Sequence, residues 1–523
     1  MSSVILRSDF KGLSPAEFFY RNREIAGFSN PVRALYQTIR ELLENSLDAT
    51  ELYGILPTIE IDIKIDEEHS DRVIITVKDN GIGVPIEHVP YVFGSVFYGS
   101  KYDLKQSRGI FGLGIKMAVL YSQLTTGKPI FVRSSTPDSP IVHEEEIMID
   151  ISKNMPIIVS QRIFKKRRKE HGTEVRITIE GNWAMAKRRV EEYVRRTAMI
   201  APYAEIRLRG PDLELEFKRS TRILPNPPRL GKPHPYGVDI ELLKMLISDC
   251  DANMTLKEFL LKKFEGTGER TIATFLRWSK LNGNAKVKKL SIKDLDQLSK
   301  AMRGFSKWRR PRPIPLSPLG EKLLKEGVKK ILKPEYISAV TRKASSYSGH
   351  PFIVEVAIAY GGEIPVVDKP ILYRFANKIP LLYDEGVDVA RKVVDSIDWG
   401  YYKVKFPAPL AVIVHICSTK IPFKGVGKEA VADVPEVERE IANAIKDCAR
   451  RLRRHISYIE KIHEIKRRKI TILKYLPEVT RALNEITGVS EKTIKEKLIA
   501  ILEKDLKSRG EAKIGKEAKT KSV

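Results

Sequence analysis

The sequence predicts a multidomain α+β protein with an α/β sandwich, a small all-α domain and a second α/β domain that ends in a long helix. Three observations support this fold class. The chain has 523 residues, enough for three to four domains at about 150 residues each. A helical pattern is followed by many short strands, and two proline-rich stretches then enclose a purely helical region. Together these observations exclude a single small binding module.

The first part of the chain opens with a helix and continues with strands. Residues 31–53 carry leucines and isoleucines at helical spacing, and Asn30 followed by Pro31 is a favourable helix start. Strict alternation of isoleucine over 59–65 then indicates a half-buried strand. This order predicts one sheet covered by helices on one face. Further strands are expected at 73–77, 130–134, 145–151, 156–159 and 173–179.

Proline-rich stretches at 225–235 and 309–318 mark boundaries around the helical region. Helices are expected there at 238–246, 256–264, 271–281 and 292–302. Strands are expected again at 352–360, 364–376 and 410–417, followed by a long helix over 436–469 and a disordered basic tail over 507–523. The expected segments are an N-terminal segment at 1–20, the α/β sandwich at 21–228, the all-α domain at 229–306 and the second α/β domain with its long helix at 307–470. A helical segment with the tail follows at 471–523.

Charge and cysteine content narrow the class of protein. Lys and Arg number 92 against 66 Asp and Glu, and the formal net charge of +26 favours a polyanionic partner. No apolar run approaches the roughly 18 residues that cross a bilayer, and no signal peptide is apparent. A cytoplasmic protein that does not bind membranes is expected. Cys250, Cys417 and Cys448 form no CxxC pair and are expected to be small buried side chains.

Four short motifs carry candidate chemistry. Glu41, Asn45 and Asp48 share one face of the first helix. The segment 79–83, Asp-Asn-Gly-Ile-Gly, follows the second strand directly, and His171-Gly172-Thr173 opens a later strand. The fourth motif, over 109–114, is glycine-rich and leads into a helical pattern, which is how backbone N–H groups and a helix N-terminus bind phosphate. Each motif alone has an ordinary explanation as a solvated helix face or a turn.

The four motifs in this order resemble the Bergerat ATP-binding fold of the GHKL family, which includes gyrase-type topoisomerases, heat-shock chaperones, histidine kinases and MutL repair proteins. The resemblance implies that ATP and Mg²⁺ are the cofactors. It implies that Glu41 is the general base, that Asn45 binds Mg²⁺ and that Asp79 accepts a hydrogen bond from the adenine amino group, supported by Thr173. The expected nucleotide-binding residues are Asn45, Asp79, Gly81, Gly83, Ser100, Lys101, Gly109, Ile110, Phe111, Gly112, Leu113, Gly114, Ile115, Lys116, Thr173 and Lys428.

Four further features resemble the B subunits of archaeal-type topoisomerase VI, and the resemblance covers about residues 1–470. The helical region resembles their helix-two-turns-helix insertion, and 14–28 and Asp398-Trp399 match as well. The segment 422–428 looks like the loop of their transducer domain, which resembles domain 2 of ribosomal protein S5. By this resemblance Lys428 contacts the γ-phosphate, although Lys424 is a rival and the usual Gln-Thr before the lysine is Val426-Gly427 here.

This resemblance implies partners and a mechanism. Two B subunits would associate through their ATPase domains when ATP binds, with residues 1–20 as a strap that crosses between them. They would form an A2B2 heterotetramer with A subunits that carry the tyrosine nucleophile. The resemblance also implies that the protein is cytoplasmic and associated with the nucleoid. Duplex DNA would bind without sequence specificity. The candidate DNA-binding residues are Lys165, Lys166, Arg167, Arg168, Lys169, Lys286, Lys288 and Lys289.

Two alternative functions stay open from the sequence. One is a GHKL chaperone or a MutL-like DNA-repair clamp without a cleavage partner. The other is a DNA-binding scaffold with a degenerate ATP site, although Glu41 and Asn45 are both intact. The histidine kinase and gyrase branches are disfavoured, because too few residues precede the first motif for a sensor and too few follow the long helix for a cleavage domain.

Overall fold

The computed structural model describes residues 12–99, 105–109, 113–166, 170–425, 427–502 and 504. The chain divides into two compact units, one formed by 1–398 with 406–449 and the other by 399–405 with 450–523. Among the described residues, no helix combines the length and the apolar character that a membrane crossing requires. The predicted disordered tail at 507–523 lies outside the described residues.

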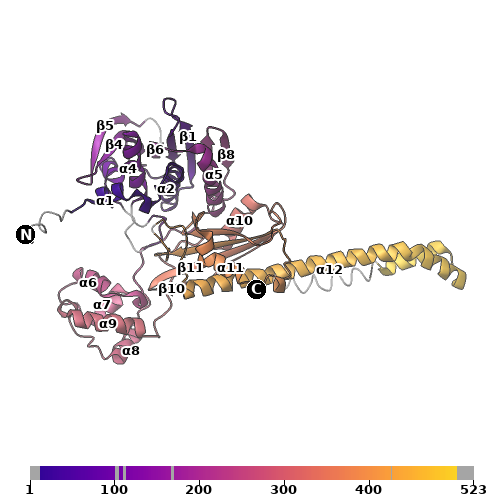
Figure 1. The fold of residues 1–523 in the computed structure, drawn as a ribbon. Helices are drawn as coiled ribbons and strands as arrows, with labels where there is room; N and C mark the ends of the chain where they lie inside the picture. The colour runs from indigo at the N-terminus through magenta and orange to yellow at the C-terminus, as the bar shows by residue number, and fades with distance from the viewer. Residues whose placement is uncertain are drawn as a thin grey trace, which may run out of the picture. The chain divides into compact units, whose positions relative to one another are not determined.

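The first unit begins with an eight-stranded sheet that is covered by helices on one face (Figure 1). Its strand order is β5-β4-β3-β6-β2-β1-β7-β8. The strands are β1 (Thr58–Ile65), β2 (Arg72–Asp79), β3 (Ile130–Ser135), β4 (Ile141–Asp150), β5 (Met155–Lys165), β6 (Gly172–Glu180), β7 (Glu205–Gly210) and β8 (Leu213–Phe217). The helices are α1 (Pro15–Arg21), η1 (Arg23–Ala26), α2 (Pro31–Glu51), α3 (Val89–Gly94), α4 (Gly114–Thr126) and α5 (Trp183–Ile200).

Alternating burial explains this sheet. In β1 the isoleucines at 59, 61 and 63 are buried beneath the helices, and Ile61 lies opposite Val77 of β2 in an antiparallel pair. Helix α2 places Leu35, Leu43 and Leu47 on the same core. The predicted sandwich with helices on one face is therefore confirmed. Each predicted strand corresponds to an observed one, although β4 begins at Ile141 and not at 145, and β5 continues to Lys165 and not only to 159.

No elements are expected from the sequence between residues 180 and 217, where the structure contains α5, β7 and β8. Helix α5 is amphipathic, begins at the cap residue Asn182 and buries Val190 and Val194. Strand β7 pairs with β1 in parallel, so it depends on a contact between residues almost 150 positions apart. Local periodicity in two short strands that mix charged and apolar residues gives little indication of such a pairing.

The helical region contains η2 (Pro235–Gly237), α6 (Ile240–Ser248), α7 (Leu256–Lys263), α8 (Glu269–Ser279), η3 (Val287–Lys289) and α9 (Ile292–Gly304), and all four predicted helices are present. Its separate core includes Phe259, Phe275 and Trp308. Thr255 and Ser291 each start a helix with a capping box. The side chain of the cap residue accepts a hydrogen bond from the backbone N–H three residues later, and the acidic side chain at that later position accepts one from the backbone N–H of the cap residue. Irregular chain at 218–234 and 305–319 flanks the region. The exact domain boundaries stay predictions.

A second sheet follows, with strand order β10-β11-β14-β12-β13 and with β9 also paired to β11. Its strands are β9 (Tyr336–Thr341), β10 (Ser345–Tyr347), β11 (His350–Tyr360), β12 (Ile371–Ala376), β13 (Ile379–Pro380) and β14 (Leu410–Ser418). Its short helices are α10 (Gly320–Leu332), η4 (Glu385–Val387) and α11 (Val389–Asp395). The strand expected at 364–376 begins only at Ile371, because Pro365 and Pro370 cannot donate to a ladder.

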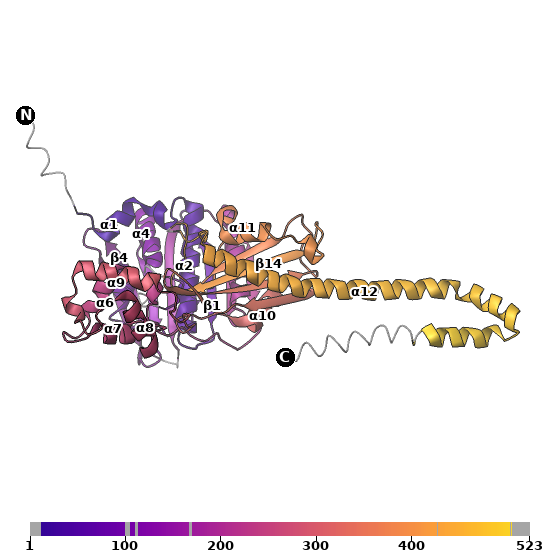
Figure 2. The same cartoon turned by 90° about the horizontal axis from the view of Figure 1, so that it is seen from below.

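Helix α12 (Pro435–Thr487) starts in the first unit, where Ile441, Ile445 and Cys448 are buried, and continues into the second. It is longer than predicted, since it continues past 469, through Pro477, to Thr487. A helical segment over 491–502 then turns back beside it (Figure 2). In the same unit η5 (Gly400–Tyr402) brings Tyr401 beneath the guanidinium of Arg453, 4.6 Å from the ring centroid. All three cysteines are buried, as predicted.

Candidate functional site

A cavity of about 520 Å³ lies in the first unit, lined by α2, β2, the start of α4, β6 and the loop before α12. The volume is in the range of small-molecule sites. It brings together residues from all four sequence motifs and from the 422–428 segment, which are separated by up to nearly 400 positions. The predicted site residues on its wall are Glu41, Asn45, Asp79, Gly83, Gly109, Leu113, Gly114, Ile115, Lys116, Thr173 and Lys428.

Asp79 lies at the end of β2 with a fixed carboxylate. Its Oδ1 accepts hydrogen bonds from the backbone N–H of Gly81 (2.8 Å) and of Thr173 (3.2 Å), and its Oδ2 accepts one from Ser46 Oγ (3.0 Å). Since a carboxylate oxygen can accept two hydrogen bonds, Oδ2 offers the cavity a further acceptor position. Burial raises the pKa of Asp79 despite these hydrogen bonds.

The glycines near Asp79 are required by neighbouring protein atoms. A Cβ at Gly81 would lie 2.8 Å from Ala49 Cβ on α2, and Gly81 is absent from the residues that line the cavity. Gly83 has a φ of +70°, and a Cβ there would lie 2.2 Å from the carbonyl oxygen of Ser135. The backbone N–H of Gly81 therefore holds the Asp79 carboxylate although Gly81 does not line the cavity, whereas Gly83 forms part of the cavity wall.

The carboxylate of Glu41 lies against the beginning of α4. A Cβ at Gly114 would approach Glu41 Oε2 to 1.6 Å, so a side chain at this position would displace the Glu41 carboxylate. Gln37, one turn earlier on α2, donates from Nε2 to Glu41 Oε1 over 2.9 Å and fixes the carboxylate. Asn45, one turn later, faces the same cavity. The arrangement places a carboxylate and a carboxamide beside the N-terminus of a helix, which attracts anions.

Lys116 is buried on α4, and its Nζ donates to the carbonyl oxygen of Tyr98 over 2.7 Å. It brings a positive charge to the cavity wall near the glycine motif. Five predicted nucleotide-binding residues lie outside the described residues: Ser100, Lys101, Ile110, Phe111 and Gly112.

The structure separates the two lysines proposed for the γ-phosphate. Lys428 is on the cavity wall, and its Nζ lies 3.5 Å from the carbonyl oxygen of Arg108. Lys424 is absent from this wall and pairs with Asp433 at 3.2 Å. The geometry therefore favours Lys428. Its φ of +55° is uncommon for a residue with a side chain and must be held by its surroundings.

Two buried arginines hold the residues that flank Lys428. Arg40 Nη1 lies 3.0 Å from Glu429 Oε1 and its Nε 2.8 Å from Glu44 Oε1, which also accepts a hydrogen bond from Tyr193. Arg374 Nη1 donates to the carbonyl oxygen of Glu429 over 3.2 Å. Arg40 immediately precedes Glu41, so α2 connects the predicted base to the loop of Lys428. Arg40, Gln37 and Ser46 were not predicted, because they lie among the motif residues on α2 but have no pattern of their own.

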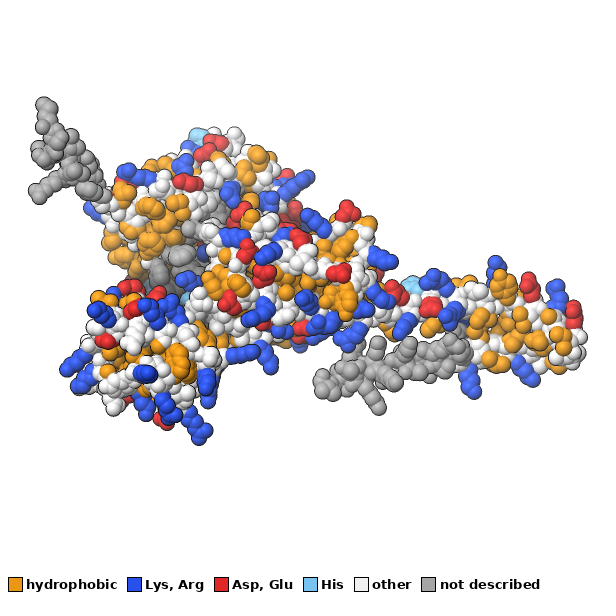
Figure 3. Space-filling model, turned by 60° about the horizontal axis from the view of Figure 1, so that its bottom comes forward, with side chains coloured by type: hydrophobic (Ala, Val, Ile, Leu, Met, Phe, Trp, Pro, Cys, Tyr) orange, Lys and Arg blue, Asp and Glu red, His pale blue; other side chains and the backbone are white. Residues whose placement is uncertain are grey.

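The candidate DNA-binding residues are spread over two regions. Lys165 is exposed at the end of β5, whereas Lys166 donates to the carbonyl oxygen of Thr136 over 3.0 Å. Arg167, Arg168 and Lys169 lie outside the described residues. Lys286, Lys288 and Lys289 are exposed around η3, and Figure 3 shows many Lys and Arg side chains over the helical region.

These features define a class of protein. The cavity combines an acceptor for a base amino group, a helix N-terminus, two lysines and a carboxylate next to a carboxamide. These groups fit an adenine nucleotide with its metal ion, because Mg²⁺ prefers oxygen ligands such as the Asn45 carboxamide. Residues 30–182 match the family described as histidine kinase-, DNA gyrase B- and HSP90-like ATPase. The chain thus contains an ATPase domain of the GHKL class.

Comparison of the whole chain identifies the particular family. Residues 311–468 match the family described as the transducer of the topoisomerase VI B subunit. The B subunit of type 2 DNA topoisomerase 6 from Pyrobaculum aerophilum is 53% identical over 497 residues, covering 95% of this chain and 94% of that protein. The corresponding protein of Saccharolobus islandicus is 45% identical over 510 residues, covering 96% of each. The chain belongs to the family of type 2 DNA topoisomerase 6 B subunits.

Family membership decides between the functions left open by the sequence. The chain is the ATP-driven B subunit of a type IIB DNA topoisomerase, and the chaperone and repair-clamp alternatives are not supported. Among solved structures, the 43K ATPase domain of Thermus thermophilus gyrase B covers 91% of this chain and 99% of its own length. Its identity of 13% and TM-score of 0.41 are too low to add to this assignment.

Proposed function

We propose that this chain binds ATP with Mg²⁺ in the cavity, closes with a second copy around duplex DNA, and drives strand passage through a break made by an A subunit. The proposal rests on one observation: residues from the four sequence motifs and Lys428 line the same cavity. Lys428 belongs to the segment matched as transducer. A nucleotide bound there would therefore contact both the ATPase domain and the transducer.

The chemistry follows from the positions of the side chains. Glu41, held by Gln37, would take a proton from the attacking water. Asn45 would hold Mg²⁺, which would neutralise phosphate charge. The N-terminus of α4 and Lys116 would bind the phosphates, and Lys428 would stabilise charge that develops on the γ-phosphoryl group.

The proposed assembly requires two interfaces. Of the proposed strap, residues 1–11 lie outside the described residues, and α1 packs against α4 of its own chain. The last part of α12 exposes several large apolar side chains, which Figure 3 shows in orange. A surface of this kind is typical of a partner interface, and we assign it to the A subunit. Its exposed residues are Ile470, Ile472, Leu473, Tyr475, Val479 and Ile486.

Relaxation of supercoiled DNA tests this function. The purified chain is mixed with its A subunit, Mg²⁺ and ATP, and topoisomers are separated on a gel. Relaxation is expected only when both subunits and ATP are present. Relaxation without ATP, or the complete absence of ATP hydrolysis by the full chain with DNA, would contradict the proposal.

Nucleotide affinity is expected to depend on the protonation of Asp79. Because burial raises its pKa, the carboxyl group takes up a proton at a higher pH than an ordinary aspartate does. ATP affinity should therefore fall as the pH drops through this raised pKa and stay constant above it. Calorimetric titrations at a series of pH values measure this dependence. An affinity that is unchanged until the chain unfolds in acid would exclude Asp79 as the adenine acceptor.

DNA binding is expected to depend steeply on salt, because contacts with phosphates release counterions. Replacing Lys286, Lys288 and Lys289 by glutamine should reduce the magnitude of the slope of log K against log salt by roughly 2 to 3. Lys64→Gln, on the exposed end of β1, is the control and should leave the slope unchanged. Fluorescence anisotropy with unrelated duplex sequences measures the slope. A slope near zero for the unmodified chain would contradict phosphate-driven binding.

A further inference from the structure

A buried group of four charges lies beside the candidate nucleotide site. Arg108 Nη1 is 2.7 Å from Asp48 Oδ1, and its Nη2 is 2.6 Å from Glu51 Oε1. The second oxygen of Glu51, Oε2, is 3.0 Å from Lys378 Nζ. Each of the four side chains is at most 6% exposed. Two positive and two negative charges balance, as buried charges require.

The four residues come from three parts of the first unit. Asp48 and Glu51 lie on α2, the helix that carries Glu41 and Asn45. Arg108 immediately precedes Gly109, the first residue of the glycine motif. Lys378 is in the turn between β12 and β13, within the segment matched as transducer. Glu51 is thus a carboxylate shared between the base of the glycine motif and the transducer.

Hydrogen bonds reinforce this connection on both sides of Arg108. Asn377 Nδ2 donates to the carbonyl oxygen of Ser107 over 3.1 Å. Gln106 Oε1 accepts from the backbone N–H of Ser317 over 2.7 Å, and Lys378 Nζ also donates to Ser317 Oγ over 3.0 Å. Gln106 and Ser107 are therefore hydrogen-bonded directly to the segment matched as transducer, and Arg108 is connected to it through Glu51.

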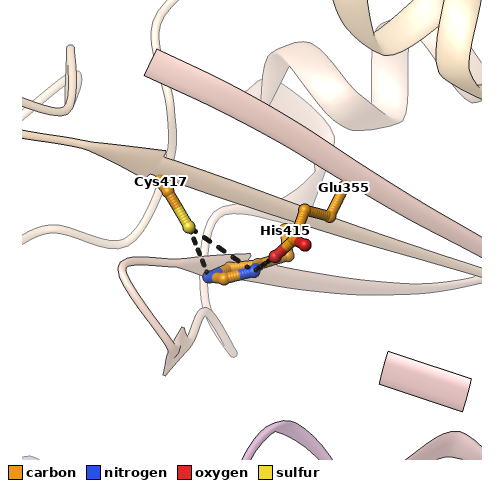
Figure 4. A group of neighbouring side chains, drawn as sticks. All are labelled: Glu355, His415 and Cys417. Carbon is orange, nitrogen blue, oxygen red and sulfur yellow. Dashed lines mark hydrogen bonds and ion pairs between the residues drawn. The ribbon is translucent and has the colours of Figure 1, made fainter. Parts of the chain in front are cut away.

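The turn that carries Lys378 is itself fixed to the core of the second sheet. The backbone N–H of Lys378 donates to His415 Nε2 over 3.0 Å, so the proton of this imidazole is on Nδ1, which donates to Glu355 Oε2 over 2.8 Å. Glu355 also accepts from the backbone N–H groups of Leu319 and Gly320 at the start of α10. Figure 4 shows His415 between Glu355 and Cys417.

The group in Figure 4 resembles a metal site, but its hydrogen bonds give it another role. His415 uses both ring nitrogens, and Glu355 accepts four hydrogen bonds from described residues, including one from Thr341. Burial acts to raise the pKa of Glu355, but the hydrogen bonds from His415 and the backbone lower it. Glu355 and His415 therefore form a rigid anchor from which Lys378 reaches Glu51.

We propose that Lys378 is a positioning residue that couples the transducer to Gly109, the start of the glycine motif on the cavity wall, acting through Glu51 and Arg108 and in parallel with Lys428. Movement of the β12–β13 turn changes the charge balance at Glu51, and Arg108 transmits this change to Gly109, the next residue in the chain. The inference rests on the proposed function, because it requires ATP in the cavity. It adds a second connection whose side chains, Lys378 and Arg108, are both absent from the cavity wall, although the carbonyl oxygen of Arg108 lies 3.5 Å from Lys428 Nζ.

The test measures ATP hydrolysis by the full chain with its A subunit, with and without duplex DNA, and compares KM, basal kcat and stimulation by DNA. Lys378→Met should leave KM and basal kcat within about threefold but reduce stimulation at least about fivefold, the lower end of typical coupling between sites. Lys378→Arg should restore stimulation. Lys392→Met, which breaks the exposed pair with Glu438 on the same sheet domain, is the matched control and should behave like the unmodified chain.

A double variant guards against misfolding of the single one. Glu51→Gln combined with Lys378→Met removes one charge of each sign and leaves the Asp48–Arg108 pair neutral, and it should show the same loss of stimulation. Full stimulation in either folded variant would overturn the inference. A lowered melting temperature with unchanged stimulation would assign Lys378 a purely structural role and also overturn it. If the unmodified enzyme hydrolyses no ATP, the proposed function itself fails.

Discussion

Replacement of Glu41 by glutamine is expected to slow ATP hydrolysis by roughly 10²- to 10⁴-fold, the usual contribution of a positioned general base. The glutamine side chain keeps the shape of glutamate, which matters because Gly114 is packed directly against this carboxylate. The variant should still bind ATP, since Asp79, Lys116 and the start of α4 are unchanged. Single-turnover hydrolysis measures the chemical step, and equilibrium binding of ATP with Mg²⁺ measures affinity.

A control on the same domain separates this effect from a general loss of charge. Glu60→Gln, on the face of the sheet that lacks helices, breaks a pair with Arg207 at 3.0 Å and should leave hydrolysis unchanged. Unchanged turnover in Glu41→Gln would remove Glu41 as the base. Loss of ATP binding in this variant would instead indicate that Glu41 has a structural role.

Replacement of Lys428 by alanine is expected to abolish ATP-driven strand passage while ATP affinity changes by less than about tenfold, or about 1.4 kcal/mol. The physical reason is that Lys428 would stabilise charge that develops at the γ-phosphoryl group, as arginine fingers do. Removal of such a finger lowers the rate by roughly 10³- to 10⁵-fold. Relaxation of supercoiled DNA and the rate of ATP hydrolysis, both at saturating ATP, measure this loss.

Lys424→Ala is the matched control for Lys428→Ala. Lys424 is four residues away in the same loop but pairs with Asp433 rather than lining the cavity. It should keep nearly full activity. If Lys424→Ala alone abolished ATP hydrolysis and strand passage, Lys424 would be the phosphate sensor and the position favoured by the structure would be wrong.

The fold could be predicted where burial repeats along the chain. The isoleucines of β1 and the apolar run of β14 identified these strands, because one strand has a solvated face and the other is buried on both faces. The region of α5, β7 and β8 was missed, because its strands are stabilised by pairing with distant segments. The extent of α12 was also missed, because the helix was expected to end at 469 but continues to Thr487.

The candidate site could be predicted as a set of motifs but not as a connected structure. The sequence indicated Glu41, Asn45 and Asp79, because their types and order match a known ATPase pattern. It contained no sign that Arg40 contacts Glu429 or that Glu51 is shared by Arg108 and Lys378. These ion pairs join residues about 60 to 390 positions apart, and only the folded chain brings them together.

Calorimetric titration of the full chain with a non-hydrolysable ATP analogue and Mg²⁺ tests the central claim, that this cavity binds ATP. One analogue should bind per chain, and the matching GTP analogue should bind at least about 10-fold more weakly, because guanine has a carbonyl oxygen at C6, where adenine has the amino group that would donate a hydrogen bond to Asp79. The absence of binding heat at millimolar ATP analogue, or equal binding of the two nucleotides, would contradict the account.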